Sequence, residues 1–253
     1  VALVTGAGRG IGKGIAEVLA EAGADVAINA LTATHVTGVA ASIAARSGRT
    51  AVPVIADVTK AAGAQLAVDE VLKRFGRIDI LVNALGDSLK APLSALPGRA
   101  DAARPISDAD LAFIMDINLT EALLCTRAVG PHMLARRSGK VINVSSWTGL
   151  RGGGEMVLYT TAKTALAGFT RAQALEWAPY GVQVNCIAPG LFPDVVTQGI
   201  DGVRRTGERA LREVPLGRPG HLREAGLLAL YLASNASDYM TGQTLMLDGG
   251  LSL

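Results

Sequence analysis

Short apolar runs alternate along the chain with longer stretches in which apolar residues recur every three or four positions. The runs predict seven strands, at residues 1–4, 24–29, 50–56, 78–84, 140–144, 182–187 and 244–247. The recurrent stretches predict helices, one directly after the first strand and others at about 35–46, 60–74, 107–136, 157–178, 200–213 and 222–234. Because the strands contain few polar residues, both of their faces should be buried. We therefore predict an α/β fold, a doubly wound parallel sheet of seven strands with helices on both faces.

The first predicted strand ends in a glycine-rich turn, Thr5-Gly6-Ala7-Gly8-Arg9-Gly10-Ile11-Gly12, and an amphipathic helix follows at once. Glycine allows positive φ and lets the backbone approach a pyrophosphate closely, while the first amides of a helix point at its negative charge. A glycine cluster alone also fits an ordinary tight turn. Its place between a strand and a helix favours a nucleotide site.

Composition narrows the classes of protein that remain. The chain has 253 residues, of which 49% are hydrophobic and 18% charged, and no linker divides it, so we expect a single domain over residues 1–253. A net charge of +2 argues against nucleic acid as a partner. No apolar run approaches the roughly 18 residues of a membrane span, and no signal peptide is visible. Cys125 and Cys186 fit buried free thiols, which favours a reducing, cytoplasmic compartment. Since the chain opens on a strand at Val1, we expect its natural N-terminus to lie earlier.

Small and polar residues follow most of the predicted strands. They are Gly6 after the first, Asp57-Val58 after the third, Asn83-Ala84-Leu85-Gly86 after the fourth, Ser145-Ser146 after the fifth and Pro189-Gly190 after the sixth. Each pair alone is also ordinary turn chemistry. In a doubly wound sheet, however, these positions meet at the carboxyl edge, where ligands bind.

A tyrosine and a lysine share one face of a predicted helix. Tyr159 and Lys163 lie four positions apart, Ser146 ends a neighbouring strand, and Asn118 lies in the preceding long helix. A lysine ammonium and the positive ring of an oxidised nicotinamide would lower the tyrosine pKa from its usual value near 10, so that the phenol could exchange a proton with a carbonyl or alcohol oxygen. The Ser146 hydroxyl could hold the same oxygen. Surface packing is the alternative for the pair taken alone.

At these residues the sequence resembles the classical short-chain dehydrogenases/reductases over nearly its whole length. The matching motifs occur in order: Thr5-Gly6-x-x-x-Gly10-x-Gly12, Asn83-Ala84-x-Gly86, Asp116-Ile117-Asn118-Leu119, Ser146, Tyr159-x-x-x-Lys163, Pro189-Gly190, Thr241-Gly242-Gln243 and Asp248-Gly249-Gly250. The resemblance implies a Rossmann-type fold and interconversion of a ketone and a secondary alcohol. It implies Tyr159 as acid/base, Lys163 lowering its pKa and bonding the nicotinamide ribose, Ser146 orienting substrate, and Asn118 holding a relay water. It also implies that Asp57 and Val58 contact adenine, that Asn83, Ala84 and Gly86 line the cofactor groove, and that Pro189, Gly190 and Leu191 border the nicotinamide.

Departures from the family pattern are few. Leu85 stands where the family usually has alanine or glycine, and Ser145 is a less favoured candidate than Ser146. The stretch from Asn83 to Asn118 is about ten residues longer than in compact relatives.

The end of the second strand bears on the choice of cofactor. An NAD site usually has a carboxylate there, which bonds the ribose 2′-hydroxyl and repels a 2′-phosphate. This end reads Asn29-Ala30-Leu31-Thr32, and Asp25 lies at the wrong end of the strand. Arg9 could pair with a 2′-phosphate, although it also fits a solvated side chain. We therefore favour NADP(H), with NAD(H) as the alternative.

The substrate is less well defined. The irregular segments 87–106 and 191–215 should cover the pocket, and they carry Lys90, Arg99, Arg104, Arg204, Arg205, Arg209 and Arg212. Ordinary exposed charge explains these cations, but they also fit an anionic substrate, either a sugar acid or an acyl chain on an acidic carrier. Reduction of the 3-oxoacyl carrier-protein type is favoured, and a sugar, sugar-acid or polyol dehydrogenase is the alternative. The resemblance also implies a homotetramer or homodimer.

Other readings of the same residues are weaker. A nucleotide-sensing binding protein would not need Tyr159 and Lys163. A sugar-nucleotide epimerase or dehydratase needs a differently spaced glycine turn and a larger substrate domain. His35, His132 and His221 share no ligand spacing with the cysteines, so we predict no metal site.

Overall fold

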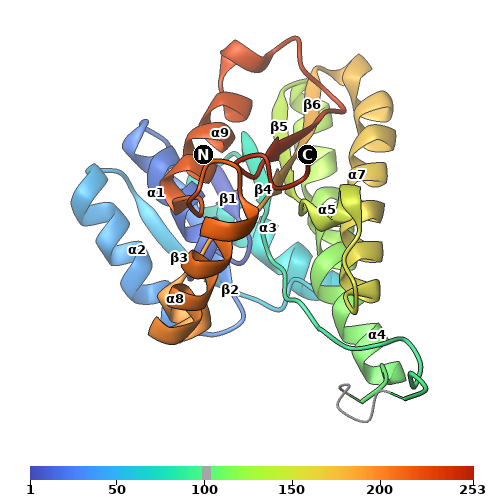
Figure 1. Ribbon diagram of the computed structural model, residues 1–253. Helices are drawn as coiled ribbons and strands as arrows, with labels where there is room; N and C mark the ends of the chain where they lie inside the picture. Colours follow the sequence, from blue (N-terminus) through green and yellow to red (C-terminus); the bar gives the residue numbers. More distant parts are fainter. Residues whose placement is uncertain (99–103) are drawn as a thin grey trace.

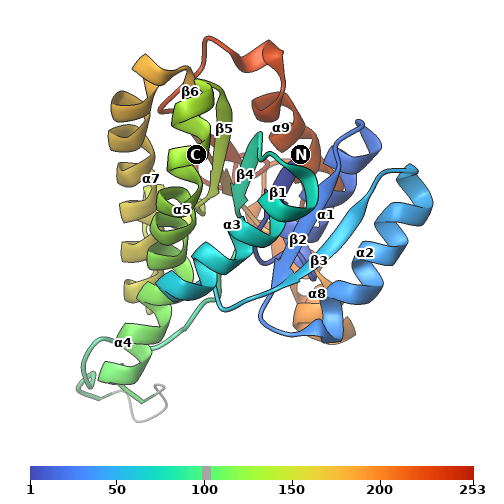
Figure 2. The ribbon, with the colours of Figure 1, turned by 180° about the vertical axis from the view of Figure 1, so that it is seen from behind.

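The computed structural model describes residues 1–98 and 104–253. Within these residues one parallel sheet is built from β1 (Ala2–Val4), β2 (Val26–Ala30), β3 (Ala51–Ile55), β4 (Ile80–Asn83), β5 (Gly139–Val144), β6 (Val182–Pro189) and β7 (Thr244–Leu247). The strand order is β3-β2-β1-β4-β5-β6-β7 (Figures 1 and 2). This order confirms the predicted doubly wound, Rossmann-type sheet, whose topology reverses between β1 and β4.

Helices cover both faces of this sheet (Figures 1 and 2). The longer ones are α1 (Gly10–Glu21), α2 (Ala33–Ser47), α3 (Ala61–Phe75), α5 (Glu121–Arg136), α7 (Val157–Trp177), α8 (Val195–Glu213) and α9 (Leu222–Ala233). Shorter pieces are α4 (Asp108–Met115), the π-helix η1 (Asp116–Thr120), α6 (Thr148–Arg151), and the 3₁₀ turns η2 (Ala178–Tyr180) and η3 (Asn235–Ser237). In the described part of the chain, no helix is both long enough and apolar enough to cross a membrane.

Alternating side chains of the strands divide the core into two layers. In β1, Ala2 and Val4 pack with Ile15 of α1 and other side chains of α1, α2 and α9. Leu3, between them, packs on the opposite face with side chains of α3, α5 and α7, such as Val71 and Val129. The period of two along the strand therefore assigns each residue to one layer.

A π-turn interrupts the long helix predicted at residues 107–136. Asn118 lies inside η1, where its side-chain amide donates to the carbonyl oxygens of Ile114, at 3.0 Å, and Asp87, at 2.7 Å. A single amide that serves both its own helix and a neighbouring loop displaces the usual backbone pattern, and such π-turns are frequent at functional sites. α8 also differs from its prediction, since it begins at Val195 and has a kink at Gly199, whose φ is +67°.

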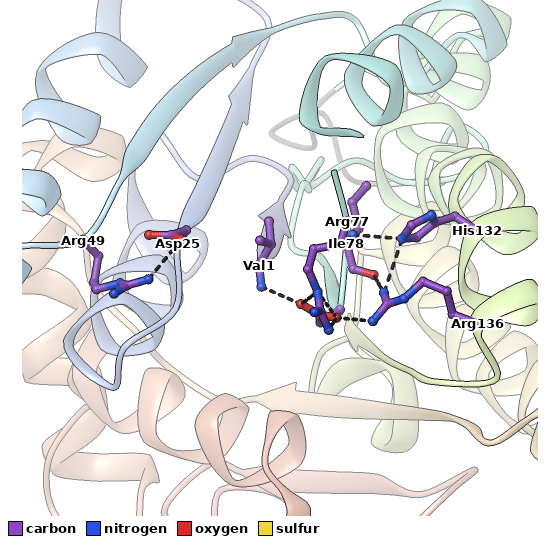
Figure 3. Close-up of polar contacts among 8 residues, drawn as sticks. Val1, Asp25, Arg49, Arg77, Ile78, His132 and Arg136 are labelled. Carbon is purple, nitrogen blue, oxygen red and sulfur yellow. Dashed lines mark hydrogen bonds and ion pairs between the residues drawn. The ribbon is translucent and has the colours of Figure 1, made fainter. Parts of the chain in front are cut away.

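A polar cluster fixes the amino edge of the sheet, opposite the glycine turn (Figure 3). The carboxylate of Asp79 accepts hydrogen bonds from the side chains of Arg77 and Arg136. His132 Nε2 accepts from the backbone N–H of Ile78 at 3.1 Å, so its ring packs as a neutral acceptor. Burial, together with the charge of Arg136, lowers the pKa of His132. Burial alone would raise the pKa of Asp79, but its hydrogen bonds from the two arginines outweigh burial and lower it.

Candidate active site

The glycine turn after β1 has the geometry of a phosphate cradle. Gly6 and Gly10 have φ of +60° and +57°, a conformation that side chains other than glycine rarely adopt. A Cβ on Gly6 would lie 2.8 Å from Leu85 Cα, and one on Gly12 would lie 2.8 Å from the Gly6 carbonyl oxygen. α1 begins at Gly10, and no side chain caps the first backbone amides of the helix. The backbone therefore fits a bound pyrophosphate, which would accept hydrogen bonds from these amides.

Thr5 joins this turn to the loop after β4. Its hydroxyl oxygen accepts hydrogen bonds from the backbone N–H of Ala84, at 3.0 Å, and of Leu85, at 3.3 Å. A Cβ on Gly86 would lie 2.9 Å from Asn118 Oδ1 and 3.1 Å from Lys163 Nζ. The space in front of Gly86 is thus bounded by two residues that we predict to be catalytic, and glycine keeps it open for the cofactor.

Other predicted cofactor residues also lie at this carboxyl edge. The Asn83 amide donates to Thr126 Oγ1 and to Asn143 Oδ1, at 3.1 and 2.8 Å, so its side chain ties β4 to α5 and β5. With its side chain used in this way, only the backbone of Asn83 can line the predicted cofactor groove. The Asp57 carboxylate accepts from the N–H and hydroxyl of Thr59, and Val58 is buried. Contacts of Asp57 and Val58 with adenine stay a prediction.

The segment after β6 is held by its neighbours. The Pro189 carbonyl accepts from the N–H of Trp147 at 3.0 Å, and the N–H of Gly190 donates to the Leu247 carbonyl at 2.9 Å. A Cβ on Gly190 would lie 2.7 Å from Asp248 Cα, so the chain needs glycine where it passes β7. Leu191 packs partly against the small core around Val214. These contacts place Pro189, Gly190 and Leu191 between the sheet edge and the start of α8.

Tyr159 and Lys163 lie on adjacent turns of α7 and face each other, as their spacing predicts. Lys163 Nζ is 5.9 Å from the centre of the Tyr159 ring and donates to the Val144 carbonyl at 2.9 Å. The Ser146 hydroxyl lies near enough to Tyr159 to lower the pKa of the phenol, and its oxygen accepts a hydrogen bond from Thr148 Oγ1 at 3.0 Å. Ser145 instead donates to the Lys163 carbonyl at 2.7 Å. Of the two serines, the geometry supports Ser146 as the one beside the phenol.

The tyrosine is not yet a good base in this arrangement. Burial raises the pKa of Tyr159 above its usual value, the nearby Ser146 hydroxyl opposes that rise, and the negative charge of Asp87 adds to it. A neutral phenol suits proton donation to a carbonyl oxygen, the step that ketone reduction requires. For alcohol oxidation, the positive nicotinamide ring of a bound oxidised cofactor would favour the phenolate.

Asn118 keeps one acceptor free at the site. Its amide nitrogen has both of its hydrogen bonds, whereas Oδ1 is buried and has no partner among the described residues. An orphaned buried acceptor needs a donor, and an ordered water would provide one. The family expectation of a relay water at Asn118 therefore fits the geometry.

The end of β2 has no carboxylate, as the sequence indicates. Asn29 donates to the carbonyls of Val54 and Ala56, at 3.1 Å each, and so serves the sheet. A Cβ on Gly8 would lie 3.7 Å from Ala30 Cβ and 3.1 Å from His35 Cβ. The side chain of His35 is thus attached beside the glycine turn. The clue to its place in the site was the position of His35 in the sequence, shortly after the second strand.

Several cations of the two covering segments are paired with carboxylates. The pairs are Lys90 with Glu155, Arg104 with Asp110, Arg204 with Asp201 and Arg209 with Glu213. Arg205 and Arg209 line a shallow hollow beside the kink of α8. Arg99 lies outside the described residues. Within those residues, no three or more His, Cys, Asp or Glu side chains are grouped to hold a metal ion.

Sequence reasoning missed one residue of this site. Glu121, the first residue of α5, is 1% exposed, and burial raises its pKa to about 8. A lone glutamate in a helical pattern normally indicates a solvated face, so only its place three residues after Asn118 hinted at the site.

Known proteins share both the sequence and the fold. Residues 6–252 match the model of the enoyl-(acyl carrier protein) reductase family. The chain is 37% identical over 253 residues to a 3-oxoacyl-[acyl-carrier-protein] reductase of Synechocystis sp., covering 99% of this chain and 96% of that one. It is 35% identical over 251 residues to a 2-dehydro-3-deoxy-D-gluconate 5-dehydrogenase of Bacillus subtilis, covering 98% and 93%. A crystal structure of a gluconate 5-dehydrogenase from Burkholderia cenocepacia, in complex with NADP and tartrate, superposes with a TM-score of 0.88 at 35% identity and covers 99% of this chain and 94% of that one.

The fold and the family matches together define an NAD(P)-dependent oxidoreductase that acts on alcohol and ketone groups. The chain belongs to the short-chain dehydrogenase/reductase family, as its motifs indicate.

Proposed function

We propose that this enzyme is an NADPH-dependent ketoreductase of the 3-oxoacyl type, with Tyr159 as its proton donor. The observation that carries the proposal is the arrangement of Tyr159, whose ring centre lies 5.9 Å from Lys163 Nζ and whose pKa the nearby Ser146 hydroxyl acts to lower. The raised pKa of Tyr159 also supports reduction, because the phenol keeps its proton until a carbonyl oxygen takes it.

In this mechanism each residue acts at a defined atom. A bound NADPH would supply the hydride to the carbonyl carbon. Tyr159 gives its phenolic proton to the carbonyl oxygen, and the Ser146 hydroxyl donates to the same oxygen as negative charge develops on it. The ammonium of Lys163 stabilises the resulting phenolate, and the free acceptor of Asn118 holds the water through which Tyr159 regains a proton.

The nucleotide preference rests on the end of β2. Ala30 follows Asn29 there without a carboxylate to repel a 2′-phosphate, and exposed Arg9 and His35 flank the glycine turn. A guanidinium pairs well with phosphate oxygens. The Burkholderia cenocepacia relative, whose structure holds NADP, supports the same choice.

Two substrate classes follow from the relatives, and both carry negative charge. The 3-oxoacyl carrier-protein reductases act on carrier-linked acyl groups, whereas the gluconate enzymes act on sugar acids. Arg205, which lines the hollow beside α8, suits either class. We favour the acyl class for its reductive direction, and a sugar-acid dehydrogenase is the second candidate.

The test follows nicotinamide absorbance with four groups of substrates: 3-oxoacyl thioesters, sugar acids, polyols and simple ketones. We expect NADPH oxidation with 3-oxoacyl thioesters at a higher kcat/KM than with any other group. A higher kcat/KM for sugar acids would reject the acyl assignment in favour of the second candidate. Turnover with none of the four groups would contradict the proposed function.

Assembly into a dimer or tetramer is part of this proposal. Leu175 on α7 is 81% exposed and Leu123 on α5 is also exposed, although both helices pack their other faces in the core. Exposed apolar side chains of this kind are typical of subunit interfaces. Light scattering should give the mass of two or four chains, and Leu175→Arg should lower it.

A further inference from the structure

The Ser146 hydroxyl has a polar partner two residues further along the chain. Thr148, the first residue of α6, donates to Ser146 Oγ from its hydroxyl, at 3.0 Å, and from its backbone N–H, at 3.3 Å. Ser146 is 6% exposed and Thr148 is 3% exposed, so water has little access to either hydroxyl. One buried residue therefore approaches one serine oxygen with two donors.

These two contacts use the acceptor capacity of Ser146. A serine hydroxyl offers two lone pairs and one proton. Because both lone pairs accept from Thr148, the proton of Ser146 has to point to a different acceptor. A hydroxyl stabilises a developing oxyanion only when its hydrogen faces that oxygen, so the direction of this proton decides whether the serine can act.

The turn that carries Thr148 is fixed by the surrounding chain. The Ser146 carbonyl accepts from the backbone N–H of Gly149 at 3.0 Å. A Cβ on Gly149 would lie 2.9 Å from the carbonyl carbon of Lys163, so α6 packs directly onto α7. The Thr164 hydroxyl on α7 donates to the Gly149 carbonyl at 2.7 Å and ties the two helices together. Thr148 thus approaches Ser146 from a rigid piece of backbone.

We propose that Thr148 is a positioning residue that acts through Ser146, turning the serine proton toward the substrate oxygen. This inference rests on the proposed function, in which Ser146 donates to that oxygen while Tyr159 gives up its proton. A hydroxyl that is already oriented when the substrate arrives needs no reorganisation as charge develops. The effect of Thr148 therefore belongs to the transition state rather than to substrate or nucleotide binding.

The first test is Thr148→Val, which keeps the branched shape and the backbone N–H of threonine but removes the hydroxyl. We expect kcat for reduction of the preferred carbonyl substrate to fall by about tenfold, which is less than the roughly 100-fold loss expected for Ser146→Ala, because the serine remains. KM and the affinity for NADPH should change by less than about twofold. An unchanged kcat would overturn the proposal.

Two further variants of Thr148 separate its hydroxyl from its packing. Thr148→Ser keeps the donor and loses only a methyl group, so kcat should stay within about twofold of the wild type. Thr148→Ala covers the case in which valine disturbs the turn, and it should show the same loss of about tenfold. A serine variant as slow as the valine variant, or an alanine variant as fast as the wild type, would overturn the proposal.

The matched control is Thr164→Val. It removes a hydroxyl that holds the same turn through Gly149 but has no contact with Ser146. We expect a lower Tm and an unchanged kcat. A loss of kcat equal to that of Thr148→Val would mean that looseness of α6 governs turnover, which would contradict a specific action of Thr148.

A double variant shows whether Thr148 acts through Ser146. Adding Thr148→Val to Ser146→Ala should cause no further loss of kcat, because the hydroxyl to be oriented is gone. A further loss as large as that of Thr148→Val alone would overturn the proposal.

The same variants give a measurement that needs no turnover. In the cofactor-free protein, the Tm loss of the double variant should be smaller than the two single losses added together, since both single variants remove the same hydrogen bond. A loss equal to that sum would contradict the contact on which the inference depends.

Failure of this inference and failure of the proposed function give different results. A large loss of kcat in Ser146→Ala, together with wild-type turnover in Thr148→Val, rejects the inference and leaves the function intact. Full turnover in Ser146→Ala, or absence of turnover in the wild type, rejects the proposed mechanism and the inference with it.

Discussion

Lys163 Nζ lies 5.9 Å from the centre of the Tyr159 ring, and Lys163 itself is almost fully buried. In the proposed mechanism, this ammonium stabilises the Tyr159 phenolate electrostatically. The strength of such an effect depends on whether the ammonium keeps its proton, and burial lowers the pKa of Lys163 to about 8.

The open space at Gly86 predicts the effect of the smallest side chain. Gly86→Ala would place a Cβ 2.9 Å from Asn118 Oδ1, and Asn118 is held by two hydrogen bonds. We expect turnover to fall by about 10- to 100-fold, because a displaced amide or lysine misaligns the site. Steady-state kinetics with NADPH measures this change.

The control for that variant is Gly38→Ala, on an exposed part of α2 where a Cβ would meet nothing within 4 Å. It should leave turnover unchanged and raise Tm slightly, since alanine is the better helix former. Equal turnover in Gly86→Ala and Gly38→Ala would mean that the space in front of Gly86 is not used.

The end of β2 predicts a change of nucleotide preference. Ala30→Asp should lower the ratio of kcat/KM for NADPH over NADH by about tenfold or more, because the new carboxylate repels a 2′-phosphate and can bond a 2′-hydroxyl. Ala30→Asn has nearly the same shape without the charge and should change the ratio far less. An unchanged ratio in Ala30→Asp would place the ribose elsewhere.

The Asp79 cluster predicts how stability depends on pH. The folded-state pKa of Asp79 is depressed, so its contribution is present above the unfolded pKa of about 4 and is lost as pH falls towards the folded value. Asp79→Asn should therefore lower the free energy of unfolding at pH 7 by about 1 kcal/mol, and this difference should shrink below about pH 4.

Urea denaturation at several pH values measures that difference. Asp201→Asn serves as the control, since Asp201 is exposed and its contact with Arg204 is long, at 3.4 Å. The control should change stability by less than about 0.5 kcal/mol at every pH. A difference for Asp79→Asn that stays constant into acid would contradict the assigned pairing.

Much of the fold could be predicted because local patterns carry it. Apolar runs gave the strands, and the shared carboxyl edge of parallel strands brought the glycine turn, Gly86 and Ser146 together. The spacing of Tyr159 and Lys163 set their common face, since i and i+4 residues of a helix are neighbours.

The parts that escaped prediction depend on contacts between distant segments. At the π-turn, the amide of Asn118 also reaches the carbonyl of Asp87, 31 positions away. Glu121 is buried although it stands in a helical pattern that would normally place it on a solvated face. No periodicity within the helix predicted at residues 107–136 could reveal either feature.

The central claim is that the Tyr159 phenol supplies the proton. The most direct measurement compares wild type and Tyr159→Phe for nucleotide affinity and for turnover with the preferred carbonyl substrate. The ring and its packing remain in the variant, so we expect unchanged NADPH binding and a loss of turnover of about 100- to 10,000-fold. Near-normal turnover in Tyr159→Phe would contradict the account.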